Sequence, residues 1–215
     1  MSVSFSPSGE NAIQSFRLTN NSAEKVAIKI SIVSRQMNGE GIETLQPADD
    51  MFVVYPSRVI LEKDNIQVVK VQWKGPPDIS IEQSFRIIAE QIPVDFGGQK
   101  SGNLRVLFRF LGAIYITPKN AAADIVLDHV EQKTVSGQKA LAITLYNKGN
   151  AHVLMNNLTL NIKTSESSKT YSAEDLKAFN GENMLAGLKR TFIVSLPPDM
   201  KGSDYNVAFQ FDPVH

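Results

Sequence analysis

The feature that most constrains the fold is an alternation of apolar with polar or small side chains, which recurs along the chain. Such a period of two is typical of a half-buried β-strand, whose successive side chains point to opposite faces of a sheet. The runs are short, rich in β-branched and aromatic residues, and separated by Gly, Pro and Asn. They cover residues 26–32, 66–73, 85–89, 141–145, 158–162 and 207–211.

Strands of this length and spacing predict antiparallel sandwiches. A chain of 215 residues has room for two domains of about 100 residues each. A boundary is expected near residues 118–121, after a long apolar run and before a fresh alternation at residues 125–127. About seven strand candidates lie on each side, as in an immunoglobulin-like fold. We therefore expect an all-β protein with two immunoglobulin-like β-sandwich domains, at residues 1–118 and 119–215.

The sequence offers one short helix. Ser172 is a candidate cap for residues 173–179, and Asp175 stands three residues further on. A capping box normally has Glu or Gln at that position, so the helix signal is weak.

Composition excludes several functions. Acidic and basic side chains number 22 each, which argues against nucleic acid or an anionic membrane as the main partner. The chain has no cysteine, so thiol catalysis and disulfides are excluded. No apolar run approaches the length of about 18 residues that spans a membrane. The start, residues 1–5, has neither the basic nor the apolar part of a signal peptide. If the protein is exported, we expect its signal peptide to have been removed.

No catalytic set can be assembled from the sequence. His129, His152 and His215 lack metal-ligand spacing, and no nucleophile elbow, P-loop or dinucleotide fingerprint occurs. We expect no enzyme activity, no cofactor and no metal. Trp73 is interpreted as a core residue.

The segment at residues 104–116 is unusually long and apolar for a strand. Leu104, Val106, Phe108 and Phe110 share one face, and Arg105 and Arg109 lie on the other. One interpretation is a core strand with two solvated arginines. The other is an interaction strand with an open edge, which adds a partner's strand through backbone hydrogen bonds. Proteins normally protect open strand edges from pairing with other chains, so a long apolar edge indicates that it binds a partner.

Four motifs in order resemble the PapD-like pilus chaperones. Residues 51–61 resemble the family's segment with Tyr-Pro and a later Leu, here Tyr55, Pro56 and Leu61. Residues 83–93 resemble its sixth strand, which ends in an acidic residue, one more residue and Ile-Pro. Residues 104–118 resemble its seventh strand and the exit to the second domain. Residues 145–152 resemble the second domain's N-x-G-N-x-H turn.

The resemblance implies a periplasmic chaperone that works by donor-strand complementation. In this family the seventh strand fills the groove of an incomplete pilin or fimbrial subunit, until an outer-membrane usher exchanges it for the next subunit. Leu104, Val106, Phe108 and Phe110 would then fill the groove. The resemblance implies subunits and usher as partners, with neither nucleic acid nor a small-molecule substrate. An unliganded chain could self-associate through the donor strand.

The chain departs from the family where the subunit's C-terminal carboxylate is usually held. The family's Arg and Lys positions fall near residues 2–4 and Ala113, and neither is basic here. Arg109 and Arg86 are the candidate anchors, with Arg17 and Arg105 as further basic residues. For Arg109, a solvated charge on the strand is an equally good interpretation.

Three other functions remain open from the sequence. A two-domain structural or adhesion subunit of a surface assembly would show the same strand pattern. An adaptor similar to the major sperm protein would share the first domain's fold. A hydrolase with an immunoglobulin-like accessory domain is disfavoured, because no catalytic residues are found.

Overall fold

The computed structural model describes residues 1–94, 106–177 and 179–214. The chain forms two compact units. The first unit comprises Met1–Gln36 and Thr44–Lys119, and the second comprises Met37–Glu43 and Asn120–His215.

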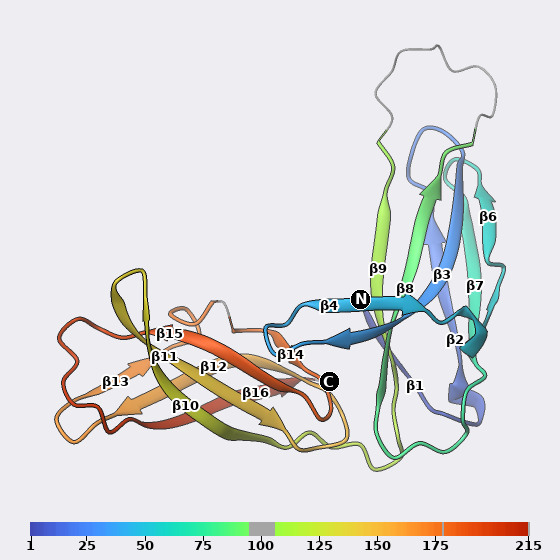
Figure 1. Cartoon of the computed structure of the whole chain (residues 1–215). Coiled ribbons are helices and arrows are strands. Elements are labelled where there is room, and N and C mark those ends of the chain that lie inside the picture. Colours follow the sequence, from blue (N-terminus) through green and yellow to red (C-terminus); the bar gives the residue numbers. More distant parts are fainter. Residues whose placement is uncertain (95–105, 178, 215) are drawn as a thin grey trace. The chain divides into compact units, whose positions relative to one another are not determined.

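The first unit is a sandwich of two sheets (Figure 1). The larger sheet has the strand order β1-β9-β8-β3-β4, and β6 also pairs with β3. Its strands are β1 (Ser2–Phe5), β3 (Val26–Met37), β4 (Glu43–Pro47), β6 (Arg58–Leu61), β8 (Gln83–Ile92) and β9 (Arg109–Ile116). The smaller sheet has the order β2-β7-β5, from β2 (Ile13–Thr19), β5 (Phe52–Tyr55) and β7 (Ile66–Trp73). Two 3-10 turns complete this unit, η1 (Glu10–Ala12) and η2 (Asp49–Met51).

Aromatic side chains join the two sheets of the first unit. The ring of Phe52 lies 5.1 Å from that of Trp73 and 5.0 Å from that of Phe85, in edge-to-face contacts. The indole N–H of Trp73 donates to the carbonyl of Pro76 at 3.1 Å. Trp73 is therefore a core residue whose polar group has a partner.

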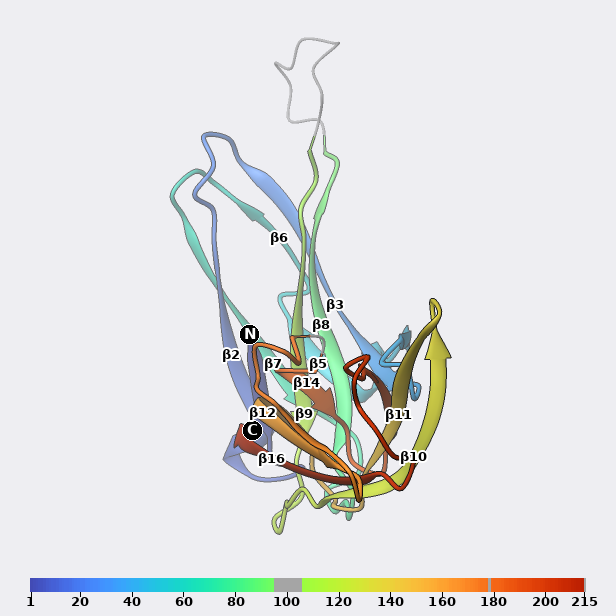
Figure 2. The ribbon, with the colours of Figure 1, turned by 90° about the vertical axis from the view of Figure 1, so that its left-hand side faces the viewer.

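The second unit has two further sheets. The first has the order β10-β11-β15, and Figure 2 shows β10 and β11 running side by side. In the other, β12 pairs with β13, β14 and β16. The strands are β10 (Ile125–Val135), β11 (Gln138–Asn147), β12 (Val153–Lys163), β13 (Ser168–Tyr171), β14 (Glu182–Met184), β15 (Lys189–Ser195) and β16 (Asn206–Val214). The buried residues Leu141, Ile143 and Leu160 belong to the core between these sheets.

The turn after β11 is built around Asn147, which is fully buried. Its amide group donates to the carbonyls of Ala151 at 2.8 Å and Met184 at 3.0 Å. Its side-chain oxygen accepts from the backbone N–H groups of Asp124 at 3.1 Å and Gly149 at 3.0 Å. A side chain on Gly149 would place its Cβ 2.2 Å from the carbonyl oxygen of Ala122, so only glycine fits. The Asn-x-Gly pattern at 147–149 is thus explained by local structure.

The expected all-β class is confirmed, and each of the six alternating runs lies in a strand. The helix expected at residues 173–179 is wrong, because the described residues there form turns. Ser172 and Asp175 do make the reciprocal contact of a cap: the Ser172 N–H donates to the Asp175 carboxylate at 2.8 Å. Within the described ranges, no helix has the length and apolar character needed to cross a membrane.

Candidate functional site

The two edges of β9 are covered to different extents. β8 pairs with β9 along its whole length, from Glu90 opposite Arg109 to Gln83 opposite Ile116. On the other edge, β1 runs parallel to β9, and the register begins with Ser2 opposite Ala113. Among the described residues, no strand pairs with that edge at residues 109–112. The N-terminal half of β9 is therefore an open strand edge.

Backbone direction identifies the groups on this open edge. The Gln91 N–H donates to the Phe108 carbonyl at 2.9 Å, so residue 108 and its even-numbered successors point their polar groups toward β8. The Ala113 N–H donates to the Met1 carbonyl at 3.0 Å, so the odd-numbered residues point toward the β1 side. The polar backbone groups of Arg109 and Leu111 consequently face the open edge.

Apolar side chains accompany this open edge. Val106, Phe108 and Phe110 are 59%, 57% and 68% exposed. The rings of Phe108 and Phe110 stack with centroids 6.3 Å apart, so they project from the same side. Further along that face, Ile114 and Ile116 are fully buried in the core. One face of the strand thus changes from exposed aromatic surface to core at the point where the pairing with β1 begins.

The strand begins later than the sequence suggested. β9 starts at Arg109, whereas a strand from residue 104 was expected. The reason lies in β8, which ends at Ile92: Pro93 follows and has no N–H to continue the ladder. Val106 and Phe108 precede the strand, and Leu104 lies outside the described residues.

The candidate anchors have different surroundings. Arg109 lies opposite Glu90, and its Nε is 3.5 Å from the carboxylate, with both side chains about half exposed. Arg86 lies on β8, opposite Ala113 of β9, and is half-buried. Ser2, Ala113 and Arg86 are therefore neighbours across three strands, so Arg86 is the basic residue placed beside the positions where the family has its Arg and Lys.

Sequence reasoning missed a buried pair on the same sheet. Arg35 on β3 donates to the Tyr115 hydroxyl on β9 at 2.9 Å, and both side chains are buried. The signal available was an arginine just after the alternating run at residues 26–32, but its partner is 80 residues away.

Sequence comparison identifies no relative. No protein-family model matches the chain, and no curated protein matches it either.

Structural comparison finds similar folds over almost the whole chain. A chain of the chaperone–tip adhesin complex of CFA/I fimbriae has a TM-score of 0.59 at 14% identity, covering 97% of this chain and 95% of that one. The class 5 fimbriae chaperone CfaA has a TM-score of 0.58 at 16% identity, covering 99% and 96%. A chain of the CsuC–CsuE chaperone–tip adhesion subunit complex of Acinetobacter baumannii has a TM-score of 0.57 at 13% identity, covering 89% and 86%. This chain therefore has the two-domain, all-β fold of the fimbrial chaperones, as its resemblance to the PapD-like proteins predicts.

Proposed function

We propose that the chain is a non-enzymatic periplasmic chaperone that binds fimbrial or pilin subunits by donor-strand complementation and delivers them to an outer-membrane usher. The observation that carries this proposal is the open edge of β9 at residues 109–112, beside the exposed Phe108 and Phe110. A subunit that lacks one strand would gain backbone partners from the edge and apolar side chains for its groove. The fold shared with fimbrial chaperones supports the same conclusion.

Subunit binding needs both the burial of apolar side chains and the backbone hydrogen bonds of the open edge, as approximate free energies indicate. Burying Val106, Phe108 and Phe110 in a groove gains roughly 5–9 kcal/mol, at about 1.5–3 kcal/mol for each side chain. Association costs roughly 4–15 kcal/mol in lost freedom. Side-chain burial alone therefore gives weak binding at best, and the backbone groups of Arg109 and Leu111 are required to hold the subunit.

A subunit's C-terminal carboxylate needs a cation near the end of this edge. Arg86 is our candidate, because it lies beside Ala113, where the open edge ends. Arg109, whose Nε lies 3.5 Å from the Glu90 carboxylate, is the second candidate. Leu104 is included as a further groove-filling residue on the sequence pattern alone.

Co-production with a candidate fimbrial subunit tests the proposal. We expect a one-to-one complex by size-exclusion chromatography, which Phe108→Glu and Phe110→Glu each abolish while the free chain stays folded by circular dichroism. Val68→Glu is the matched control, since Val68 is an exposed apolar residue on the outer face of the smaller sheet. If the Phe108→Glu and Phe110→Glu variants both still bind the subunit, the edge is not the binding site. Concentration-dependent polymers of the pure chain, together with failure to form the one-to-one complex, would favour the alternative of a structural subunit.

A further inference from the structure

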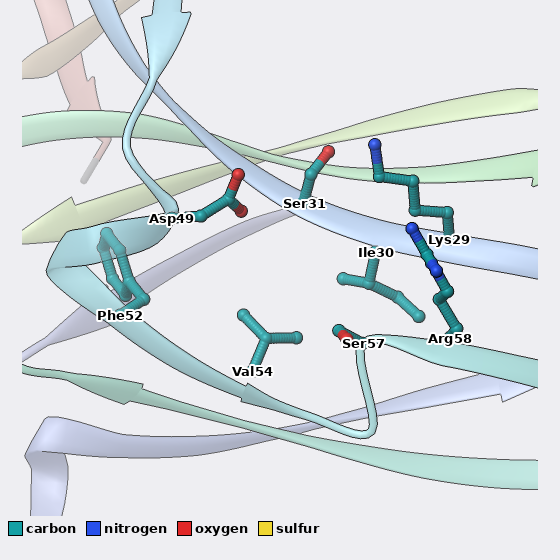
Figure 3. Close-up of a pocket in the computed structure, with 8 residues that line it drawn as sticks. All are labelled: Lys29, Ile30, Ser31, Asp49, Phe52, Val54, Ser57 and Arg58. Carbon is teal, nitrogen blue, oxygen red and sulfur yellow. The ribbon is translucent and has the colours of Figure 1, made fainter.

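A hollow of about 380 Å³ opens at the edge of β3, away from β9 (Figure 3). It exists because the chain changes sheets here. β6 pairs with the first part of β3 and β4 with its last part, while β5 between them joins the smaller sheet. Isolated hydrogen bonds span the gap, including the one in which the Ile30 N–H donates to the Ser57 carbonyl at 2.8 Å. The hollow is thus a consequence of the topology.

Two cations stand at one end of the hollow. Lys29 and Arg58 are register partners on β3 and β6, and both line it. In Figure 3 their charged ends lie on the same side of the sheet. Like charges directly opposite one another destabilise a strand pair. Among the residues that the structure describes, neither has a carboxylate within 4.0 Å. This pair therefore lacks a counter-charge.

The nearby acidic groups are already engaged. Glu90 is the register partner of Lys29 on β8, but its carboxylate contacts Arg109 at 3.5 Å. Asp49 also lines the hollow, and it accepts the Ile32 N–H at 2.8 Å. In Figure 3, Ser31 lies between the Asp49 carboxylate and the two cations. The hollow therefore has a basic end and an acidic end, with an excess of positive charge.

Hydroxyl groups also line the hollow. Ser31 and Ser57 supply them near the cations, while Phe52 of β5 is buried in the core beneath. A guanidinium offers two parallel N–H donors to an oxyanion, and an ammonium adds a compact charge. An oxyanion placed between them would relieve their repulsion and accept hydrogen bonds at the same time.

We infer that Lys29 and Arg58 form an oxyanion-binding site that takes a carboxylate or phosphate group. This carboxylate or phosphate group would belong either to a free small anion or, for the carboxylate, to the acidic side chain of a bound protein segment. The site is separate from the open edge of β9 and does not depend on the function proposed for that edge.

Thermal unfolding of the full chain tests this site. Phosphate and succinate are titrated in turn, with sodium chloride keeping the ionic strength constant. We expect each anion to raise the melting temperature saturably. The double variant Lys29→Gln/Arg58→Gln should lose this rise, with affinity falling about tenfold or more. Its melting temperature without anion should not fall, because a repulsion has been removed. Lys70→Gln is the control, since Lys70 is an exposed lysine with Ser15 and Tyr55 as its register partners.

A second arm identifies the source of the anion. A short capped peptide with one internal Glu is compared with its Gln counterpart, by backbone amide shifts of residues 29–31 and 57–58. Saturation by the Glu peptide below the concentration needed for succinate identifies an acidic protein segment as the ligand. Saturation by the small anions alone identifies a free anion. The inference is overturned if the double variant responds to all probes as the unmodified chain does, or if no probe shifts these amides.

Discussion

Ser2 on β1 is the register partner of Ala113 on β9, and this pair marks the point where β9 loses its second neighbour. Beyond it, toward the start of β9, Gly112 to Arg109 pair with β8 and with no other strand in the described part of the chain. In the first unit, β9 thus lies between β1 and β8 at its C-terminal end and forms an edge of the sheet at its N-terminal end. The exposed Phe108 and Phe110 lie at the edge end.

Phe110→Ala should separate folding from subunit binding. Phe110 is 68% exposed, so its loss should change the free energy of unfolding by only about 0.5 kcal/mol. In a subunit groove it would be buried, and its loss should then speed subunit release by about 10- to 100-fold. Release is measured as the rate at which the subunit leaves the purified complex. Val68→Ala should leave that rate unchanged, and an equal effect of both variants would contradict the assignment.

Arg86 and Arg109 should differ as anchors. Arg109→Ala removes only a half-exposed ion pair with Glu90, so stability should change by less than about 1 kcal/mol. Arg86→Ala should accelerate release of a subunit with its natural C-terminus. It should have little effect on a subunit extended by three glycines, whose carboxylate has been displaced. Equal acceleration with both subunits would show that Arg86 does not contact the carboxylate.

Asn147→Ala should strongly destabilise the second unit. The substitution leaves the carbonyls of Ala151 and Met184 and two backbone N–H groups without their partner. Buried unsatisfied groups cost about 1–3 kcal/mol each, so we expect a loss of at least about 3 kcal/mol in chemical denaturation. Asn206→Ala, at an exposed strand position, is the control. A loss below about 1 kcal/mol would show that the network contributes little.

Asp204 should contribute to stability in a pH-dependent way. Hydrogen bonds from the Ser165 backbone N–H, at 3.0 Å from one carboxylate oxygen, help to hold the pKa of Asp204 below its ordinary value of 3.8. A lowered folded-state pKa stabilises the fold above the unfolded-state pKa, and this stabilisation is lost as the pH falls through the folded value. Asp204→Asn should therefore reduce the loss of unfolding free energy on acidification from about pH 6 to pH 2. Asp78→Asn, at an exposed site of the first unit, should retain the full loss.

The strands could be predicted from the sequence because alternation reflects burial directly. Val69, Val71 and Trp73 are buried on one face of β7, as their spacing indicates. The turns at residues 173–177 could not be predicted, because Ser172 and Asp175 make the same capping contact in a turn as in a helix.

The candidate site was only partly predictable. Phe108 and Phe110 were identified by spacing, but the position where β9 becomes an edge depends on its pairing with Ser2, more than 100 residues away. The pairing of Lys29 with Arg58 was missed for the same reason, since it depends on the register between β3 and β6.

Amide hydrogen exchange of β9, with and without a bound subunit, tests the open edge itself. The Arg109 and Leu111 amides face that edge, whereas the Phe110 and Gly112 amides face β8. We expect Arg109 and Leu111 to exchange fast in the free chain and to become protected in the complex, while Phe110 and Gly112 are protected in both. Protection of Arg109 and Leu111 in the monomeric free chain, or no change on subunit binding, would contradict donor-strand complementation by β9.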